Sequence, residues 1–294
     1  MLNFQPLKIE QIPIYKQYYD YTDAIGCEYN FVSGYLWSSE YKLRAAVYDD
    51  TLIKAYFRDD KRIWGYCLPS GKNVKGAVEA ALLDARDRGQ EPMFGYLSKA
   101  ERDKLEELFP DRFVYERASD MQDYIYLTQD LALLEGKRFH AKRNHISHFY
   151  RENPDAVFAP LDDGNLSDAL RVMKLWCAEN DMDPDDYGEY TVLCEALNNY
   201  KQLGMRGAVL YADNKPVAMT LGSEISSVCF DINFEKALRG YNGSYAVINN
   251  EFAKTLTAYK YINREEDLGI EGLRKSKLSY NPVIIYDRFE AKLK

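Results

Sequence analysis

Residues 261–280 read YINREEDLGIEGLRKSKLSY and carry the densest pattern of charge and hydrophobicity in the chain. The first three residues have the β-branched and aromatic bias of a strand, and Asp267-Leu268-Gly269 then interrupts that pattern. Four residues at helical spacing follow, so that a lysine lies on an otherwise apolar face: Ile270, Leu273, Lys277 and Tyr280. We therefore predict a strand, a charged loop and a helix.

The loop between this strand and this helix carries Arg264 followed by three acids, Glu265, Glu266 and Asp267. Burying an unpaired charge is costly, so these groups must pair with one another, contact a ligand or remain in water. The plainest interpretation is a solvated loop beside a lysine whose aliphatic stem packs on apolar surface. The alternative is a site in which Arg264 and Lys277 hold an anionic or carbonyl oxygen.

Composition indicates an ordinary soluble globular protein. A chain of 294 residues suits about two domains, and its hydrophobic fraction of 46% is typical. The net charge of −8 argues against nonspecific nucleic-acid binding. Because we find neither a membrane-spanning run nor a signal peptide, we expect a cytoplasmic protein without integral membrane contact. The five cysteines form no CxxC pair, which favours reduced thiols over disulfides.

The first half is predicted to alternate helices and strands. A helix at 9–21 precedes strands at 44–47, 52–57 and 63–68. A helix at 74–88, a strand at 93–97 and a helix at 99–108 come next, and Ser98 with Glu101 should form a capping box. Strands at 113–116 and 124–127 complete this half.

The second half repeats this order without repeating residues. Helices are predicted at 165–180, 191–203, 245–258 and 270–280, and strands at 207–211, 216–222, 228–234, 259–263 and 283–286. This pattern predicts an α/β fold with a mixed α+β sheet arrangement. We place an N-terminal domain at 1–130 and a C-terminal domain at 131–294.

Residues 136–153 read GKRFHAKRNHISHFYREN and form the one concentrated basic element of an acidic chain. It could be a solvated bridge, a partner surface or a dock for phosphates, which an arginine can grip in a bidentate manner. His145 and His148 lie at neighbouring helical positions but lack a third ligand at matching spacing, so we expect no metal. Its cations are Lys137, Arg138, Lys142, Arg143 and Arg151.

Residues 235–244 read EKALRGYNGS and join a predicted strand to a predicted helix. Gly240 and Gly243 permit close backbone approach, and free amides at the start of a helix favour an anion. The chain lacks a nucleophile elbow, a P-loop and a dinucleotide fingerprint. Direct group transfer with Glu235 or Glu266 as proton acceptor is therefore favoured over a covalent intermediate.

Three segments of the chain, 136–149, 234–253 and 263–282, resemble one family. It is the soluble bacterial branch related to the C-terminal domain of phosphatidylglycerol lysyltransferases. The resemblance implies two tandem acyltransferase-like domains of the Gcn5-related N-acetyltransferase type, with a cleft between them. Lysyltransferases of this kind move an aminoacyl group from aminoacyl-tRNA to a lipid headgroup.

The chain departs from these relatives in two respects. It lacks their transmembrane segments, which argues against a lipid acceptor, so we expect a small-molecule acceptor while the choice among lipid, peptide and small molecule stays open. In acetyltransferases the pyrophosphate loop has Arg or Gln, two residues, Gly, one residue, then Gly or Ala. Here Gly240 follows Arg239 at once and Gly243 comes four residues after Arg239, so the spacing differs. Aminoacyl-tRNA and acyl-CoA both stay open as donors.

Two hypotheses follow. In the first, the protein is an acyl- or aminoacyltransferase that uses Arg264, Lys277, Glu235 and Glu266 for catalysis. The donor, including the phosphates of tRNA on the basic helix, would then contact Arg138, Lys142, Arg143, Arg239, Gly240 and Gly243. In the second, the protein is a non-catalytic sensor or scaffold for a small polar ligand, and the charged run is a structural ion network.

Replacement Lys277→Met separates the two hypotheses. If Lys277 is catalytic, the variant should keep its stability and lose turnover. If Lys277 belongs to a structural ion pair, an apolar residue of similar shape should be neutral or stabilising. Chemical unfolding and a transfer assay measure the two properties.

Overall fold

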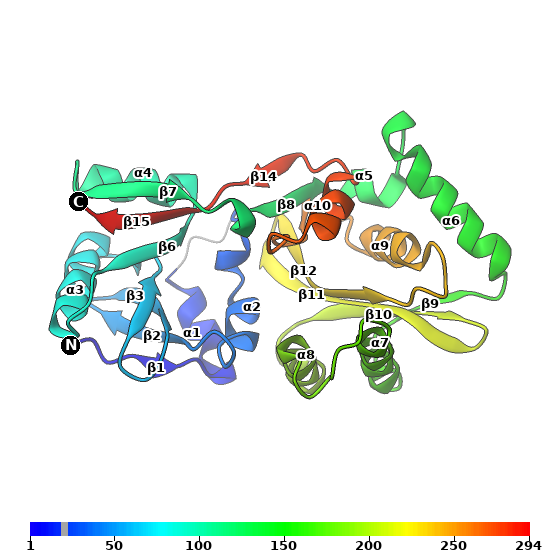
Figure 1. Ribbon diagram of the computed structural model, residues 1–294, viewed down its shortest axis with the longest axis horizontal. Helices are drawn as coiled ribbons and strands as arrows, with labels where there is room; N and C mark the ends of the chain where they lie inside the picture. Colours follow the sequence, from blue (N-terminus) through cyan, green and yellow to red (C-terminus); the bar gives the residue numbers. More distant parts are fainter. Residues whose placement is uncertain (19–22) are drawn as a thin grey trace.

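The computed structural model describes residues 1–18 and 23–294 and forms two lobes that lie side by side (Figure 1). Each lobe is built around one mixed β-sheet, and both chain termini lie in the first lobe. The predicted α/β class with mixed sheets is confirmed.

The first lobe contains an eight-stranded sheet among the described residues. Asp49 and Asp50 both adopt positive φ in the tight turn between its second and third strands, as their sequence suggests. Ser98 and Glu101 form the predicted capping box at the start of α4 (Lys99–Leu108), and both α4 and α3 (Val74–Asp87) contact strands of this sheet. The strand order is β1 (Gln5–Pro6), β2 (Leu43–Tyr48), β3 (Thr51–Phe57), β4 (Ile63–Tyr66), β6 (Met93–Leu97), β15 (Phe289–Leu293) and β7 (Phe113–Arg117), with β5 (Ser70–Gly71) on β3.

The sheet of the second lobe has seven strands within the described part of the chain, with helices on both faces (Figure 1). Their order is β14 (Ile284–Tyr286), β8 (Asp123–Leu127), β13 (Tyr261–Asn263), β12 (Cys229–Ala237), β11 (Lys215–Ser226), β10 (Arg206–Ala212) and β9 (Val157–Pro160). One face is covered by α5 (Thr128–Leu133), α6 (His140–Glu152), α9 (Ser244–Thr255) and α10 (Glu271–Leu278). The other is covered by α7 (Leu166–Glu179) and α8 (Gly188–Asn199).

The parallel pair β12 and β13 separates partway along its length. The two strands are paired from Cys229 to Asp231 and from Tyr261 to Asn263. Beyond this point β12 continues to Ala237, whereas β13 ends and the charged loop begins. Side chains from that loop can therefore lie beside the part of β12 that follows Asp231, where β13 no longer pairs with it.

The two sheets exchange strands across the predicted boundary at residue 130. Strand β8 comes from the first half of the chain but lies between β14 and β13 of the second sheet. Strand β15, at the end of the chain, lies between β6 and β7 of the first sheet. The division at residue 130 stays a prediction, and each sheet needs a strand from the other half.

The first helices of the chain fill the junction between the lobes. Their apolar residues share one core cluster with α7, α8 and both sheets. The predicted helix at 9–21 is a 3-10 turn (Ile9–Gln11) followed by α1 (Ile12–Lys16), and residues 19–21 lie outside the described residues. A 3-10 turn, η2 (Cys27–Tyr29), then leads into α2 (Phe31–Leu36). We call residues 24–33 the junction segment.

Gly243 should be required for the packing of α6 on α9. It adopts φ +95°, and a Cβ atom there would overlap the carbonyl oxygen of His145 on α6. Gly243→Ala should therefore lower the free energy of unfolding by about 1–3 kcal/mol. Gly240→Ala is the matched control, because a Cβ at Gly240 meets nothing within 4 Å. Equal losses in urea unfolding would contradict this role of Gly243.

Candidate functional site

The charged loop after β13 is held by the side chain of Lys277. Its ammonium group donates to the carbonyl oxygens of Arg264, Glu265 and Glu266, and Lys277 is only 6% exposed. Burial lowers the pKa of Lys277, and three backbone acceptors replace its lost hydration. Ile270, by contrast, is 55% exposed, so the predicted apolar face of this helix does not include it.

Arg264 and Glu235 form an ion pair where β12 and β13 separate. A guanidinium nitrogen lies 2.7 Å from the Glu235 carboxylate, and the two side chains are 11% and 8% exposed. Asn249 donates to the other Glu235 oxygen at 3.2 Å. The guanidinium lies 5.0 Å from the ring of Tyr280, and its Nη1 atom is buried without a hydrogen-bond partner in the described structure. The pair thus keeps a spare buried donor.

Lys142 brings the basic helix to the same place. Its Nζ atom on α6 lies 3.7 Å from the centre of the Tyr280 ring, which the Arg264 guanidinium also contacts. Burial and the charge of Arg264 lower the pKa of Lys142 to about 8. Two cations and one carboxylate therefore meet in a partly desolvated spot, where a net positive charge favours an anion. We call Lys142, Arg264 and Glu235 the cationic cluster.

The other residues predicted to bind the donor have partners within the protein. Arg138 forms an ion pair with Asp130 at 2.7 Å, and Arg143 donates to the carbonyls of Leu134 and Gly136. The Arg239 amide donates to Glu179 and its guanidinium to Asn180. Gly240 is exposed, Gly243 packs on α6, and His148 lies 3.1 Å from Glu152. Their roles toward a ligand stay predictions.

A second constellation, which the sequence did not single out, lies at the junction of the lobes. Asp123, at the start of β8, is fully buried and accepts hydrogen bonds from Asn263 at 2.7 Å and from the Cys27 amide at 2.8 Å. Arg288 is 1% exposed and lies 2.8 Å from Asp123 and 2.6 Å from Glu28. Arg288 thereby joins acids of both lobes.

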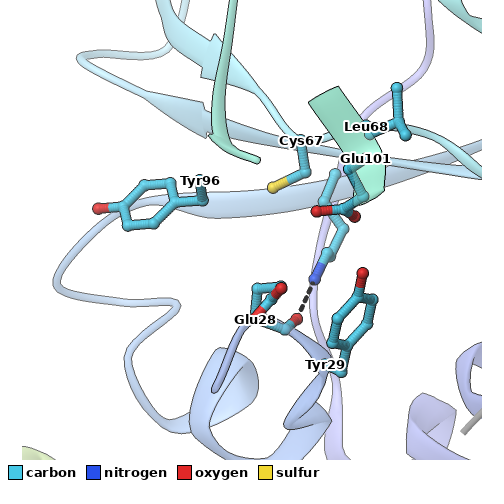
Figure 2. Close-up of a pocket in the computed structure, with 7 residues that line it drawn as sticks. Glu28, Tyr29, Cys67, Leu68, Tyr96 and Glu101 are labelled. Atoms are coloured by element: carbon cyan, nitrogen blue, oxygen red, sulfur yellow. Dashed lines mark hydrogen bonds between the residues drawn. The ribbon is translucent and has the colours of Figure 1, made fainter. Parts of the chain in front are cut away.

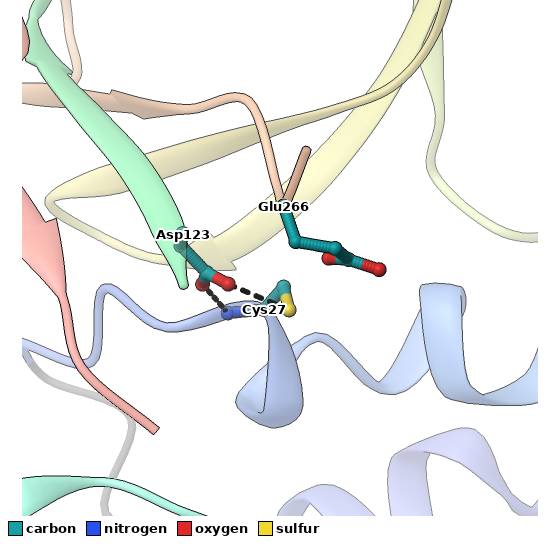
Figure 3. Close-up of side chains that lie close together, drawn as sticks. All are labelled: Cys27, Asp123 and Glu266. Atoms are coloured by element: carbon teal, nitrogen blue, oxygen red, sulfur yellow. Dashed lines mark hydrogen bonds between the residues drawn. The ribbon is translucent and has the colours of Figure 1, made fainter. Parts of the chain in front are cut away.

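Cys27, Asp123 and Glu266 could geometrically hold a metal ion, because their ligand atoms lie within 4.8 Å of one another (Figure 3). Arg288, however, already bonds to Asp123 and lies 3.6 Å from the Cys27 sulfur. Burial also raises the pKa of Cys27, so its thiol stays protonated and donates to Asp123. Asp123 and Cys27 are therefore already engaged in hydrogen bonds, and the positive charge of Arg288 would repel a metal cation at this site.

The buried acid Asp231 continues this constellation along β12. Asn30 donates to Asp231 at 2.8 Å and to the Ser223 hydroxyl at 2.9 Å. Burial raises the pKa of Asp231 to about 8 and also raises that of Glu265. The available sequence signal was an acid inside the apolar run CFDINF, residues 229–234. A buried polar group of this kind needs partners, but the sequence does not name them.

A small pocket lies in the first lobe beside Glu28, Cys67 and Tyr96 (Figure 2). Its volume of about 10 Å³ suits roughly one water molecule and not a substrate. Lys54 donates to the backbone oxygen of Glu28 at 2.9 Å, and burial raises the pKa of the Glu28 carboxyl to about 8. This pocket therefore extends the buried network of the junction.

No helix of the described residues combines the length and the apolar character that crossing a bilayer requires.

The family described as the C-terminal region of phosphatidylglycerol lysyltransferase has a model that matches residues 20–292. A protein of unknown function from Bacteroides thetaiotaomicron has a similar structure, with a TM-score of 0.92 and 35% identity over the whole of both chains. The structure of L-PGS from Bacillus licheniformis has a TM-score of 0.68 at 14% identity, covering 99% of this chain and 93% of that one. The latter likeness concerns the fold, and the expected relation to this family is confirmed.

A curated relative, an uncharacterised protein of Mycoplasmoides gallisepticum, is 25% identical over 174 residues. The match covers 58% of this chain and 56% of that protein's own length.

The geometry of Lys277 revises the outcome expected for Lys277→Met. Methionine would leave three carbonyl oxygens without their donor, so the free energy of unfolding should fall by about 1–3 kcal/mol. Lys275→Met on the same helix is the matched control, because Lys275 is exposed and pairs only with Glu271. Urea unfolding of both variants measures the difference. An unchanged midpoint for Lys277→Met would show that the loop does not depend on this lysine.

Proposed function

This chain belongs to the phosphatidylglycerol lysyltransferase C-terminal family, and on that premise we propose that it transfers an acyl or aminoacyl group to an amine or hydroxyl acceptor. The observation that carries the proposal is the convergence of Lys142, Arg264 and Glu235 from three distant segments. A donor that carries both phosphates and a reacting carbonyl suits this arrangement. The basic helix can bind the phosphates, and the lysine and arginine that meet at its buried side can bind the carbonyl.

The proposed chemistry is a direct acyl transfer. The acceptor nitrogen or oxygen attacks the acyl carbonyl carbon and forms the new bond, while the ester or thioester bond of the donor breaks. Arg264, with its spare buried donor, and Lys142 stabilise the negative charge that develops on the carbonyl oxygen. Glu235 accepts the acceptor's proton and returns it to the leaving hydroxyl or thiol.

The donor is proposed to approach along α6. Within the described structure Lys137 and Arg151 lie exposed on or beside this helix, in addition to the partly buried Lys142. Such cations contact phosphates without reading sequence, as expected for the acceptor arm of aminoacyl-tRNA or for acyl-CoA. Arg138 is engaged with Asp130, and Arg143 with backbone carbonyls. We therefore expect these two arginines to contribute less than the other cations to binding the donor's phosphates.

A second candidate function, a ligand sensor or scaffold, is favoured by the closure of the Arg264–Glu235 pair. Both side chains are nearly covered, as in an ion pair that serves stability. In that case the cationic cluster would bind a small anion without turnover.

A thermal-shift comparison should identify the donor class. At 100 times its dissociation constant, a bound donor should raise the free energy of unfolding by about 2.7 kcal/mol. Each protein is tested with aminoacyl-tRNA, with acetyl-CoA and with free amino acids. The proteins are the wild type, Lys142→Met and Lys137→Met, which serves as a control at an exposed position. We expect the shift to disappear only in Lys142→Met. If none of the compounds shifts the transition, transfer chemistry loses its support.

The pH profile should report the charge of Lys142. This lysine is charged below a pKa of about 8 and neutral above it, so kcat/KM should fall as pH rises through that value. Lys142→Arg keeps its charge over this range and should remove the alkaline fall. A rate that instead rises toward pH 8 and then levels would mean that the neutral amine acts as a base.

A further inference from the structure

Asp231 and Glu265 form a carboxyl pair inside the junction of the lobes. Asp231 is fully buried, and Asn233 donates at 3.3 Å both to its carboxyl and to that of Glu265, so the two acids are neighbours. One Asp231 oxygen accepts from Asn30 and Asn233, whereas the other, Oδ1, is buried without any donor in the described structure. A carboxylate can only accept, so two neighbouring carboxyls can bond to each other only if one of them carries a proton.

The charges around the pair do not supply a substitute for that proton. The nearest cation, Lys277 on α10, is already bound to three backbone carbonyls. Arg288 is engaged by Asp123 and Glu28. Among residues 1–18 and 23–294, the other titratable groups that act on the pair are acidic or protonated, namely Asp123 on β8, Glu266 on the loop, Cys229 on β12, and Cys27 and Tyr41.

The partners of the pair come from the junction segment and the charged loop. Asn30, which donates to Asp231, also caps α2 by accepting from the amides of Val32 and Ser33. The Ser33 hydroxyl donates to Glu265 at 3.3 Å. Glu265 itself follows Arg264 in the loop and has the left-handed φ of 53°. The pair thus contacts both the start of α2 and the backbone that carries Arg264.

We propose that Asp231 and Glu265 share one proton, and that this shared proton fastens the junction segment to the second sheet and holds the loop of Arg264 in place. The inference goes beyond the transfer chemistry and does not require it. If the proton leaves, the two neighbouring carboxylates repel each other and move apart. This movement displaces the acceptors of the hydrogen bonds that Asn30 and Ser33 donate.

The direction of the pH effect follows from burial, which raises the pKa of Asp231 to about 8 and that of Glu265 as well. The stabilising contribution is fully present below the unfolded carboxyl pKa, near about 4, and declines as pH rises toward about 8. Over this window the folded chain retains a proton that the unfolded chain has lost. The unfolding equilibrium constant should therefore rise about tenfold per pH unit for this proton.

Asp231→Asn tests the proposal, because the amide supplies a permanent donor to Glu265 with nearly the same shape. Between about pH 5 and 7.5, log K of unfolding for the wild type should increase more steeply than for Asp231→Asn by about one per pH unit. Asp155→Asn is the control, since Asp155 is exposed and should keep the wild-type slope. Glu265→Gln should reproduce the Asp231→Asn result. Equal slopes for wild type and both variants would overturn the proposal.

Infrared spectroscopy gives a second readout that does not require a stable variant. At neutral pH the wild-type protein should show a carboxylic-acid C=O band that shifts with carboxyl-labelled aspartate, a label that leaves out the buried Glu28 carboxyl, and that disappears above pH 8. Absence of any such band would contradict a shared proton. The proposal would also be overturned if the acid band were absent and the stability of the wild type depended on added sodium, potassium or magnesium. A metal cation would then lie between the two carboxyls in place of the proton.

Discussion

The arrangement of the two lobes depends on one buried guanidinium, that of Arg288. It lies between Glu28 of the junction segment and Asp123 of β8, and almost none of its surface reaches water. Removing a charge from water is costly, and only close carboxylates repay that cost. Because Glu28 belongs to the junction segment and Asp123 to the second sheet, this compensation is available only when the junction segment lies against the second sheet. Asn30, Asn263 and Lys277 then complete the network with donors to the remaining acceptors.

Local features of the sequence predicted much of the fold. The strand, loop and helix of residues 261–280 are present as β13 and α10, and the capping box at Ser98 forms because both of its members lie within one turn. Strand β15 was not predicted, although FEAKL alternates apolar and charged residues, because this run is only five residues long and its partners lie far away in the chain. The lysine on an apolar face was identified correctly, but its acceptors are the backbone carbonyls of its own preceding loop.

The candidate site could be predicted only in part, because its chemistry depends on tertiary contacts. Arg264, Glu235 and Lys142 were each singled out from local charge, and their meeting around Tyr280 follows from how α6 packs on the second lobe. Arg143 shows the opposite case, in which a cation suited to phosphate instead satisfies the carbonyls at the end of α5. Asp123, Asp231 and Arg288 were not selected, since each has at least one partner that lies more than a hundred residues away along the chain.

The exchange of β8 and β15 between the sheets has a consequence for biosynthesis. During translation the first lobe exposes the edges of β6 and β7 until residues 289–293 have left the ribosome, because β15 fills the gap between those strands. Unpaired strand edges can recruit other chains, so a chain in which β15 has not yet been made would expose a surface prone to aggregation. Insertion of β15 is thus the step that closes the first sheet.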